Sequence, residues 1–313
     1  MKILVTGGAG FIGSATAARL VRDGHAVVVL DSFNQYYDPQ LKRDRVTEFL
    51  TDCTVVEGDI CDDVLVDTLF ATNNFDAVCH FAAQAGVRYS VDAPQTYAET
   101  NVQGTLTILE AMKKHDVKQL VYASTSSAYG VDTISPFKED ATADRPISVY
   151  AATKRAAELL AHSYYYQYGI QATCVRFFTV YGPWSRPDMA MLKFAQKIDA
   201  DEPIDIYNHG DLRRDFTYID DIVEGFVLAL AKPLGFEVIN IGNGQPVELL
   251  RFVELLETSL GKTAIKNMLP MQQGDVFETY ADTTKAKELL GFQAKTSFEV
   301  GIKKFADWYR IYS

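Results

Sequence analysis

The sequence predicts an α/β fold in which a doubly wound parallel sheet precedes a smaller C-terminal domain. Up to about residue 180, short apolar runs alternate with helical segments, and a glycine-rich turn separates the first run from the first helix. Strands that alternate with helices form parallel sheets with right-handed crossovers. After about Tyr181, prolines interrupt shorter segments, which indicates a second unit. A chain of 313 residues has room for one large domain and a small one.

Each element follows from a local pattern. Apolar and β-branched runs predict six strands, at Lys2–Thr6, Ala26–Leu30, Thr54–Glu57, Ala77–Phe81, Gln119–Ser124 and Ala172–Phe178. Longer segments between them predict helices at Phe11–Arg22, Pro39–Leu50, Asp62–Phe70, Gln95–Lys114 and Val149–Tyr168. We therefore expect a first domain over 1–180, to which a later segment of about 213–242 returns. A second domain covers mainly 181–313.

Composition excludes several classes of protein. The formal net charge is -11, so the chain has no general electrostatic reason to bind nucleic acid or an anionic membrane. No apolar run approaches the length of a membrane span, and the N-terminus lacks a signal-peptide pattern. The cysteines, at 53, 61, 79 and 174, form no CxxC pair. We expect reduced thiols, a cytoplasmic location and no metal site.

The glycine-rich turn predicts a dinucleotide site. It follows the first strand and opens the first helix with the residues Gly7, Gly10, Phe11, Ile12 and Gly13. Glycine lets the backbone approach a pyrophosphate closely, and the helix N-terminus offers free N–H groups. Asp31, 18 residues beyond Gly13, ends the second strand. Its carboxylate can accept both adenosine ribose hydroxyls and would repel a 2′-phosphate, which favours NAD over NADP. The alternative is a tight turn with an ordinary strand-end aspartate.

Two later strand ends lie on the same expected edge of the sheet. Asp59 and Ile60 are placed to meet the adenine, and Ala82, Ala83 and Gln84 to follow the phosphates and ribose. Without the glycine turn, ordinary strand-end packing would explain both.

A tyrosine and a lysine predict acid–base chemistry. Tyr150 and Lys154 share one helix face at i, i+4 spacing, and a nearby ammonium favours a phenolate and lowers its pKa. Such a tyrosine can take a proton from a sugar hydroxyl while hydride leaves for a nicotinamide. A row of hydroxyl residues at 124–127 ends the fifth strand upstream. A lone YxxxK arises often on surface helices, so the combination with the glycine turn carries the prediction.

The sequence resembles the extended short-chain dehydrogenase/reductase family, the NAD-dependent epimerases and dehydratases that act on nucleotide sugars. GGAGFIG, the hydroxyl row and YAATK carry this resemblance, which covers the whole chain. Within the family it is most similar to the UDP-glucuronate 4-epimerases. The supporting segments are DSFNQYYDPQLKRDR (31–45), HFAAQAGVRYS (80–90), YASTSSAYG (122–130), SVYAATKRAAEL (148–159), RFFTVYGPWSRPDMA (176–190), RRDFTYIDDIV (213–223) and MQQGDVFETYADTTKAKELLGF (271–292).

The resemblance implies a Rossmann-type NAD-binding domain, a nucleotide-sugar-binding domain and a set of residue roles. Tyr150 would be the catalytic base, and Lys154 would orient the nicotinamide ribose. Thr125 would hydrogen-bond the sugar O4, and its neighbour Ser124 would bind the cofactor. The residues implied at the substrate are Arg88, Ser126, Ser127, Thr179, Arg186, Arg214 and Asp275. Ser126, Ser127 and Thr179 are similar to residues that hold the sugar carboxylate, and Arg214 and Asp275 to residues at the pyrophosphate and uridine ribose.

The chemistry separates the alternatives. Oxidation at C4 of a uronate gives a β-keto acid that can lose CO₂, so the position of the carboxylate decides the product. Decarboxylating relatives resemble this chain but carry a glutamate in the run TSEVYG, where this chain has Thr125, Ser126 and Ser127. We therefore expect UDP-glucuronate 4-epimerase activity. UDP-N-acetylglucosaminuronate or UDP-glucose 4-epimerase, UDP-glucuronate decarboxylase and a non-catalytic NAD sensor remain as alternatives. Relatives pair two long helices, here 95–114 and 149–168, so we also expect a homodimer.

Overall fold

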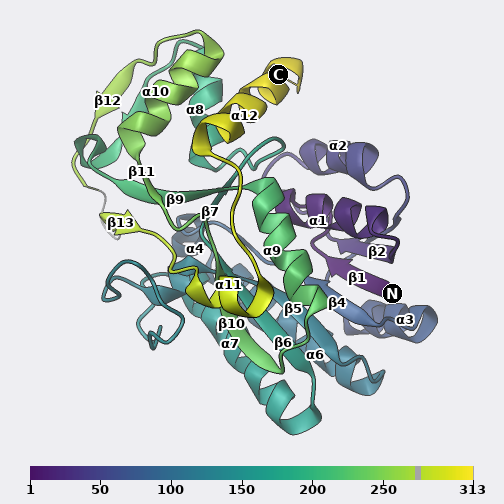
Figure 1. Cartoon of the computed structure of the whole chain (residues 1–313). Helices are drawn as coiled ribbons and strands as arrows, with labels where there is room; N and C mark the ends of the chain where they lie inside the picture. Colours follow the sequence, from purple (N-terminus) through teal and green to yellow (C-terminus); the bar gives the residue numbers. More distant parts are fainter. Residues whose placement is uncertain (272–275, 313) are drawn as a thin grey trace.

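Seven parallel strands form the main sheet of the computed structural model, which describes residues 1–271 and 276–312 (Figure 1). The strand order is β3-β2-β1-β4-β5-β6-β10. These strands are β1 (Lys2–Thr6), β2 (Ala26–Asp31), β3 (Thr54–Glu57), β4 (Ala77–His80), β5 (Gln119–Thr125), β6 (Gln171–Phe177) and β10 (Phe236–Ile241). The order reverses between β1 and β4, so a crevice opens at their carboxyl ends. The predicted Rossmann-type doubly wound sheet is confirmed.

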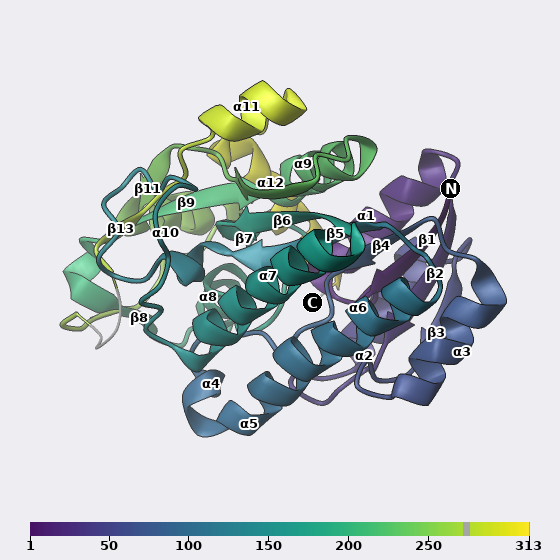
Figure 2. The ribbon, with the colours of Figure 1, turned by 90° about the horizontal axis from the view of Figure 1, so that it is seen from below.

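Helices cover both faces of this sheet (Figure 2). One face carries α3 (Asp63–Asn73), α6 (Gly104–Lys114) and α7 (Val149–Tyr168). The other carries α1 (Phe11–Arg22), α9 (Ile219–Ala231) and α11 (Thr284–Leu290), with α2 (Gln40–Phe49) against α1. β1 shows why both faces need cover: Ile3 and Val5 enter one apolar core, and Leu4 enters the other. Strands buried on both faces read as unbroken apolar runs.

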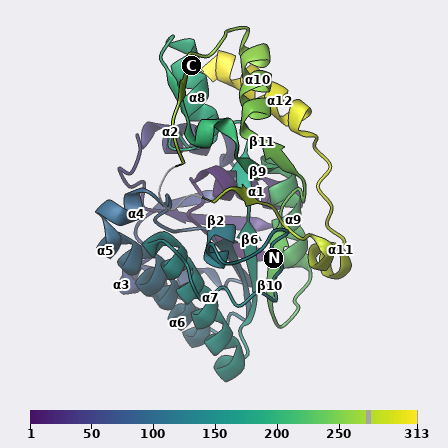
Figure 3. The same cartoon turned by 90° about the vertical axis from the view of Figure 1, so that its left-hand side faces the viewer.

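The remaining segments build a second unit beyond the sheet's edge, around α8 (Ala190–Asp199), α10 (Leu249–Leu260) and α12 (Phe298–Tyr312) (Figure 3). Its strands are β7 (Thr179–Tyr181), β8 (Ile204–Ile206), β9 (Arg213–Tyr218), β11 (Pro246–Glu248), β12 (Lys266–Met268) and β13 (Glu278–Thr279). β7, β11 and β13 each pair with β9, and β8 pairs with β12. Phe216, Phe252 and Phe298 of this unit pack against one another, with ring centroids 5.1 to 6.2 Å apart.

The structure changes two expectations. The segment 213–242 returns only in part, because its strand β9 pairs within the second sheet while α9 and β10 rejoin the first, where α11 later packs against them. The long helix expected at 95–114 is α5 (Pro94–Tyr97), a π-helical turn at Ala98–Gln103, and α6. The wider turn brings Asn101 to the backbone N–H and carbonyl of Gln84, at 2.7 and 3.1 Å. A short helix, α4 (Tyr89–Asp92), lies just before α5, in a stretch to which the sequence analysis assigned no element.

Across the described residues, none of the helices combines the length and apolar character needed to cross a bilayer.

Candidate active site

The glycine turn brings β1, α1 and the end of β4 into contact. Gly7 has a φ of +66°, and a Cβ there would lie 2.6 Å from the Ala82 nitrogen. A Cβ on Gly13 would lie 2.3 Å from the Gly7 carbonyl oxygen. Only glycine fits either position without a backbone shift. α1 starts at Phe11, and within the described chain no side chain caps it. The first-turn N–H groups of α1 therefore face the crevice as anion donors.

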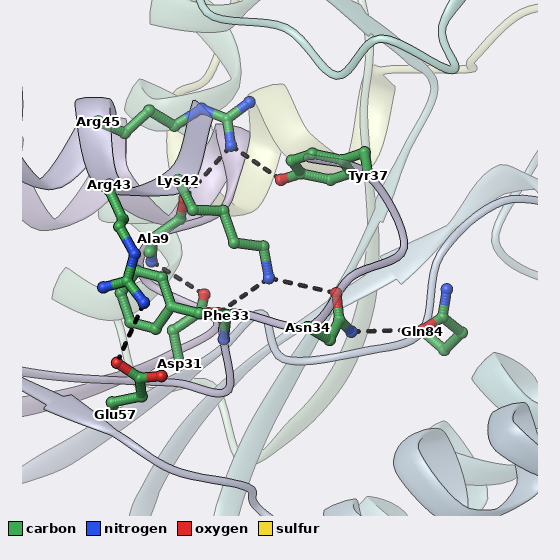
Figure 4. A network of polar contacts seen from close by, with 10 residues as sticks. All are labelled: Ala9, Asp31, Phe33, Asn34, Tyr37, Lys42, Arg43, Arg45, Glu57 and Gln84. Carbon is green, nitrogen blue, oxygen red and sulfur yellow. Dashed lines mark hydrogen bonds and ion pairs between the residues drawn. The ribbon is translucent and has the colours of Figure 1, made fainter. Parts of the chain in front are cut away.

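Asp31 lies at the centre of a polar network beside this turn (Figure 4). Its carboxylate accepts hydrogen bonds from the Ala9 and Phe33 N–H groups, at 3.1 and 2.9 Å. The Lys42 ammonium forms an ion pair with it at 2.9 Å, and both side chains are largely buried. Asn34 links this group to Gln84 at 3.4 Å. Asp31 is thus held in one orientation by backbone and cation together.

A cavity of about 970 Å³ follows the carboxyl ends of the strands. It is lined by each residue predicted to bind the cofactor, namely Gly7, Gly10, Phe11, Ile12, Gly13, Asp31, Asp59, Ile60, Ala82, Ala83, Gln84, Ser124, Tyr150 and Lys154. The predicted substrate residues Thr125, Ser126, Ser127, Thr179 and Arg186 line it too. The glycine turn and the hydroxyl row therefore belong to one continuous site.

The two helical residues of the site sit at the start of α7. The Ser148 hydroxyl caps this helix by accepting the Ala151 N–H at 3.1 Å, which fixes where its first turn begins. Tyr150 and Lys154 follow one turn apart, and the Lys154 nitrogen lies 4.2 Å from the centre of the Tyr122 ring. Thr125 ends β5, and its hydroxyl accepts the Ser127 N–H at 3.2 Å.

A family model for the NAD dependent epimerase/dehydratase family matches residues 3–242. The chain belongs to this family. A UDP-glucuronate 4-epimerase of Thermodesulfobacterium geofontis is 44% identical, over 97% of this chain and 95% of that protein. The structure of a Bacillus cereus UDP-glucuronic acid 4-epimerase, in complex with UDP-glucuronic acid and NAD, is 36% identical with a TM-score of 0.93 over 100% of both chains. A Thermotoga maritima UDP-glucose 4-epimerase with UDP-glucose is 33% identical, with a TM-score of 0.91 over 99% of both chains.

The electrostatics of this family member differ from the sequence prediction at Tyr150. Burial raises the pKa of Tyr150, while the Arg186 charge and a hydrogen bond with Thr125 oppose that rise. The expected lowering of its pKa by Lys154 is therefore wrong for this structure. Burial lowers the pKa of Lys154 itself to about 7, although the Glu158 charge opposes the change. The Lys154 nitrogen lies over the Tyr122 ring, and burial has the largest influence on the pKa of the Tyr150 phenol.

Three predicted substrate residues lie outside the cavity or outside the described chain. Arg88 is exposed, with its guanidinium 5.5 Å from the centre of the Tyr207 ring. Arg214 lies on β9 and donates to the Phe277 carbonyl oxygen at 3.2 Å. Asp275 lies outside the described residues. Arg88 and Arg214 are therefore not among the residues that line the cavity with the hydroxyl row.

The site also depends on residues that the sequence analysis missed. Glu158 is fully buried and accepts from the Ser124 hydroxyl at 2.5 Å and from two Arg176 nitrogens at 2.9 and 2.7 Å. Lys42, as described above, pairs with Asp31. The signal for Glu158 was its i, i+4 spacing from Lys154, which places it one turn further along the face of α7 that holds Tyr150.

Proposed function

We propose that the chain is an NAD-dependent epimerase that inverts C4 of UDP-glucuronate to give UDP-galacturonate. One observation carries the proposal: a single cavity joins the glycine turn and Asp31 to Tyr150, Thr125 and the hydroxyl side chains at 126, 127 and 179. Relatives named UDP-glucuronate 4-epimerase support the choice of substrate.

The residues at the cofactor end fit NAD. Gly7 and Gly13 leave backbone where a side chain would block a pyrophosphate, and the start of α1 supplies N–H donors. The Asp31 carboxylate is suited to the two adenosine ribose hydroxyls. When bound, NAD⁺ accepts a hydride from C4 of the sugar and returns it to the opposite face.

The chain itself handles the proton and the orientation of the sugar. The Tyr150 oxygen takes the O4 proton as C4 is oxidised and gives it back at the end, with Thr125 as its hydrogen-bond partner. The Arg186 charge favours the phenolate that this step needs. Lys154 orients the nicotinamide ribose. Each keeps the role that the resemblance assigns.

Short hydroxyl donors are suited to holding a uronate carboxylate. Ser126, Ser127 and Thr179 line the same cavity as Arg186. They can keep the C–C bond to the carboxylate from aligning with the π system of the C4 ketone, the alignment that loss of CO₂ requires. They also add no general acid that would assist this loss. We therefore propose that decarboxylation is suppressed. Arg88, Arg214 and Asp275 keep their proposed roles toward the UDP part of the substrate.

The deciding experiment is to incubate the protein with NAD⁺ and UDP-glucuronate and to identify the products by NMR. We expect UDP-galacturonate and little UDP-pentose. Mainly UDP-xylose or UDP-arabinose would make the protein a decarboxylase. Equal turnover of UDP-glucose would refute the substrate but keep the reaction. Tyr150→Phe should cut turnover 10²–10⁴-fold, as expected for loss of a general base, with UDP-sugar binding nearly unchanged. No turnover with any UDP-sugar would favour a non-catalytic role.

We also propose a homodimer through α7. The helix exposes several large side chains, among them Leu159 at 55% and Tyr166 at 84%. Apolar helix faces of this kind pair in helix bundles. A dimeric mass by light scattering at micromolar concentration would support it, and a monomeric mass would contradict it.

The four cysteines are free thiols, which suits the proposed cytoplasmic location.

A further inference from the structure

The Asp31 carboxylate is largely occupied by the protein itself. Its Oδ1 accepts two donors, the Phe33 N–H and the Lys42 ammonium, each at 2.9 Å. Its Oδ2 accepts the Ala9 N–H at 3.1 Å. An ionised carboxylate has about four acceptor positions, two on each oxygen. Donors from the described residues fill three of them, so Oδ2 is the oxygen with room for a ribose hydroxyl.

Lys42 stands beside Asp31 with a donor to spare. Its side chain is 9% exposed and lines the same cavity. One of its three N–H groups donates to Asp31, and a second makes a long contact of 3.5 Å with Asn34 Oδ1 (Figure 4). For the third, the described residues offer only the weak attraction of the Tyr37 ring, whose centre lies 5.7 Å from the nitrogen. Lys42 can therefore donate to a ligand that binds beside Asp31.

The next residue of α2 shows a similar ion pair outside the cavity. The Arg43 guanidinium lies 3.6 Å from the Glu57 carboxylate, and Glu57 is opposite Asp31 in the pairing of β2 with β3. Arg43 is 54% exposed, and the described lining of the cavity includes neither Arg43 nor Glu57. The helix thus places one cation at the cofactor cavity and its neighbour outside it.

We propose that Lys42 is a cofactor-binding residue that sets the discrimination between NAD and NADP together with Asp31. The inference rests on the NAD site of the proposed function and deepens it. In NAD, Asp31 shares the two adenosine ribose hydroxyls with Lys42: Oδ2 accepts one hydroxyl, and the ammonium donates to the oxygen of the other. A 2′-phosphate brings negative charge and acceptor oxygens, so Lys42 attracts it while Asp31 repels it. Discrimination against NADP is therefore the difference between two opposing charges 2.9 Å apart.

The test compares dissociation constants for NAD⁺ and NADP⁺, measured by calorimetry on the nucleotide-free protein. Lys42→Met keeps the stem of the side chain and removes the ammonium. It should weaken NAD⁺ binding about tenfold and NADP⁺ binding about a hundredfold, because a charged donor contributes more to a phosphate than to a hydroxyl. The ratio of the NADP⁺ constant to the NAD⁺ constant should thus rise about tenfold. Asp31→Asn should lower this ratio, since Lys42 then meets the 2′-phosphate without an opposing charge.

Lys42→Arg and Arg43→Met are the matched controls. Lys42→Arg keeps a cation and should hold the ratio within about threefold of wild type. Arg43→Met removes the neighbouring cation, whose exposed charge water screens, and should change the ratio less than about twofold. An unchanged or lower ratio in Lys42→Met would overturn the inference, because a lysine that only holds Asp31 in place would lose discrimination on removal. An equal rise in Arg43→Met would overturn it as well.

The double variant Asp31→Asn/Lys42→Met decides if Lys42→Met alone fails to fold. Lys42→Met leaves the buried Asp31 charge unpaired, whereas the double variant removes both charges. It should bind NADP⁺ about a hundredfold more weakly than Asp31→Asn does. Equal NADP⁺ affinities in these two variants would overturn the inference.

Failure of the proposed function gives a different result. A wild-type protein that binds NAD⁺ but epimerises no UDP-sugar would refute the proposed reaction. The dissociation constants of the variants would then still decide the role of Lys42. A wild-type protein that binds neither nucleotide would refute both.

Discussion

Replacing Lys154 with methionine should abolish turnover and yet stabilise the nucleotide-free protein at neutral pH. Burial lowers the pKa of Lys154 from 10.5 to about 7, against the opposing charge of Glu158. That difference corresponds to at most about 5 kcal/mol of unfolding free energy. The contact of the ammonium with the Tyr122 ring, at 4.2 Å, stabilises the folded protein by about 2 kcal/mol and offsets part of this cost. Methionine keeps the apolar stem and removes the desolvation cost, so we expect a net gain of about 3 kcal/mol.

The pH dependence tests the cause of this gain. Between about pH 7 and pH 10.5 the unfolded chain holds a proton on Lys154 that the folded chain has released. The stability of the wild type therefore rises with pH through this window relative to the Lys154→Met variant, and the gap closes near pH 10. Urea unfolding of both proteins from pH 7 to pH 10 measures it. Lys303→Met, an exposed lysine on α12, should change nothing. A variant that is less stable at pH 7, or a gap that stays constant with pH, would refute the reasoning.

Three further predictions concern the fold and the product. Glu158→Ala should lower the unfolding free energy by about 3–5 kcal/mol in urea titrations, because it leaves the buried Arg176 charge unpaired; an unchanged midpoint would mean that water reaches Arg176. Gly13→Ala should cost about 1–3 kcal/mol and weaken NAD⁺ binding in calorimetry, since its Cβ meets the Gly7 carbonyl; normal affinity would place the pyrophosphate elsewhere. Thr179→Ala should slow epimerisation and raise the share of CO₂ released, measured by NMR against wild type, and an unchanged product ratio would remove Thr179 from carboxylate control.

Local patterns along the chain were enough to predict the Rossmann half of the fold. β1 and β3 have the predicted limits, and α1 and α7 match as well, since apolar periodicity and the glycine turn mark these elements directly. The second unit was visible only as a run of short segments. Its strands have two to six residues each, and β9 pairs with strands distant in the sequence: Phe216 lies opposite Thr179 of β7, and Arg213 lies opposite Glu278 of β13. No local signal tells β9 which of the two sheets to join.

Residues that touch a ligand were easier to predict than the residues that hold them. Asp31 stands at a strand end, where a carboxylate has a recognised use, whereas its partner Lys42 is one of several charged residues on a polar helix. Asp188, which forms an ion pair with Arg186 at 2.9 Å, was overlooked for the same reason. A charged residue on a helix or in a loop is ordinary in sequence, and only the fold shows that it faces a buried charge of opposite sign.

The stretch from Asp31 to Arg45 links the two ends of the cavity. Asp31 binds the Ala9 N–H of the glycine turn, and the Arg45 guanidinium binds the carbonyl of the same Ala9 at 3.3 Å. Arg45 also holds the Trp184 carbonyl, two residues before Arg186. A shift of the glycine turn on cofactor binding would therefore reach the substrate segment through one buried side chain. Among the described residues, the hydrogen-bond partners of Arg45 are carbonyl groups and the Tyr37 hydroxyl, so the dipoles of these groups stabilise its charge. Its removal would therefore loosen both ends of the site together.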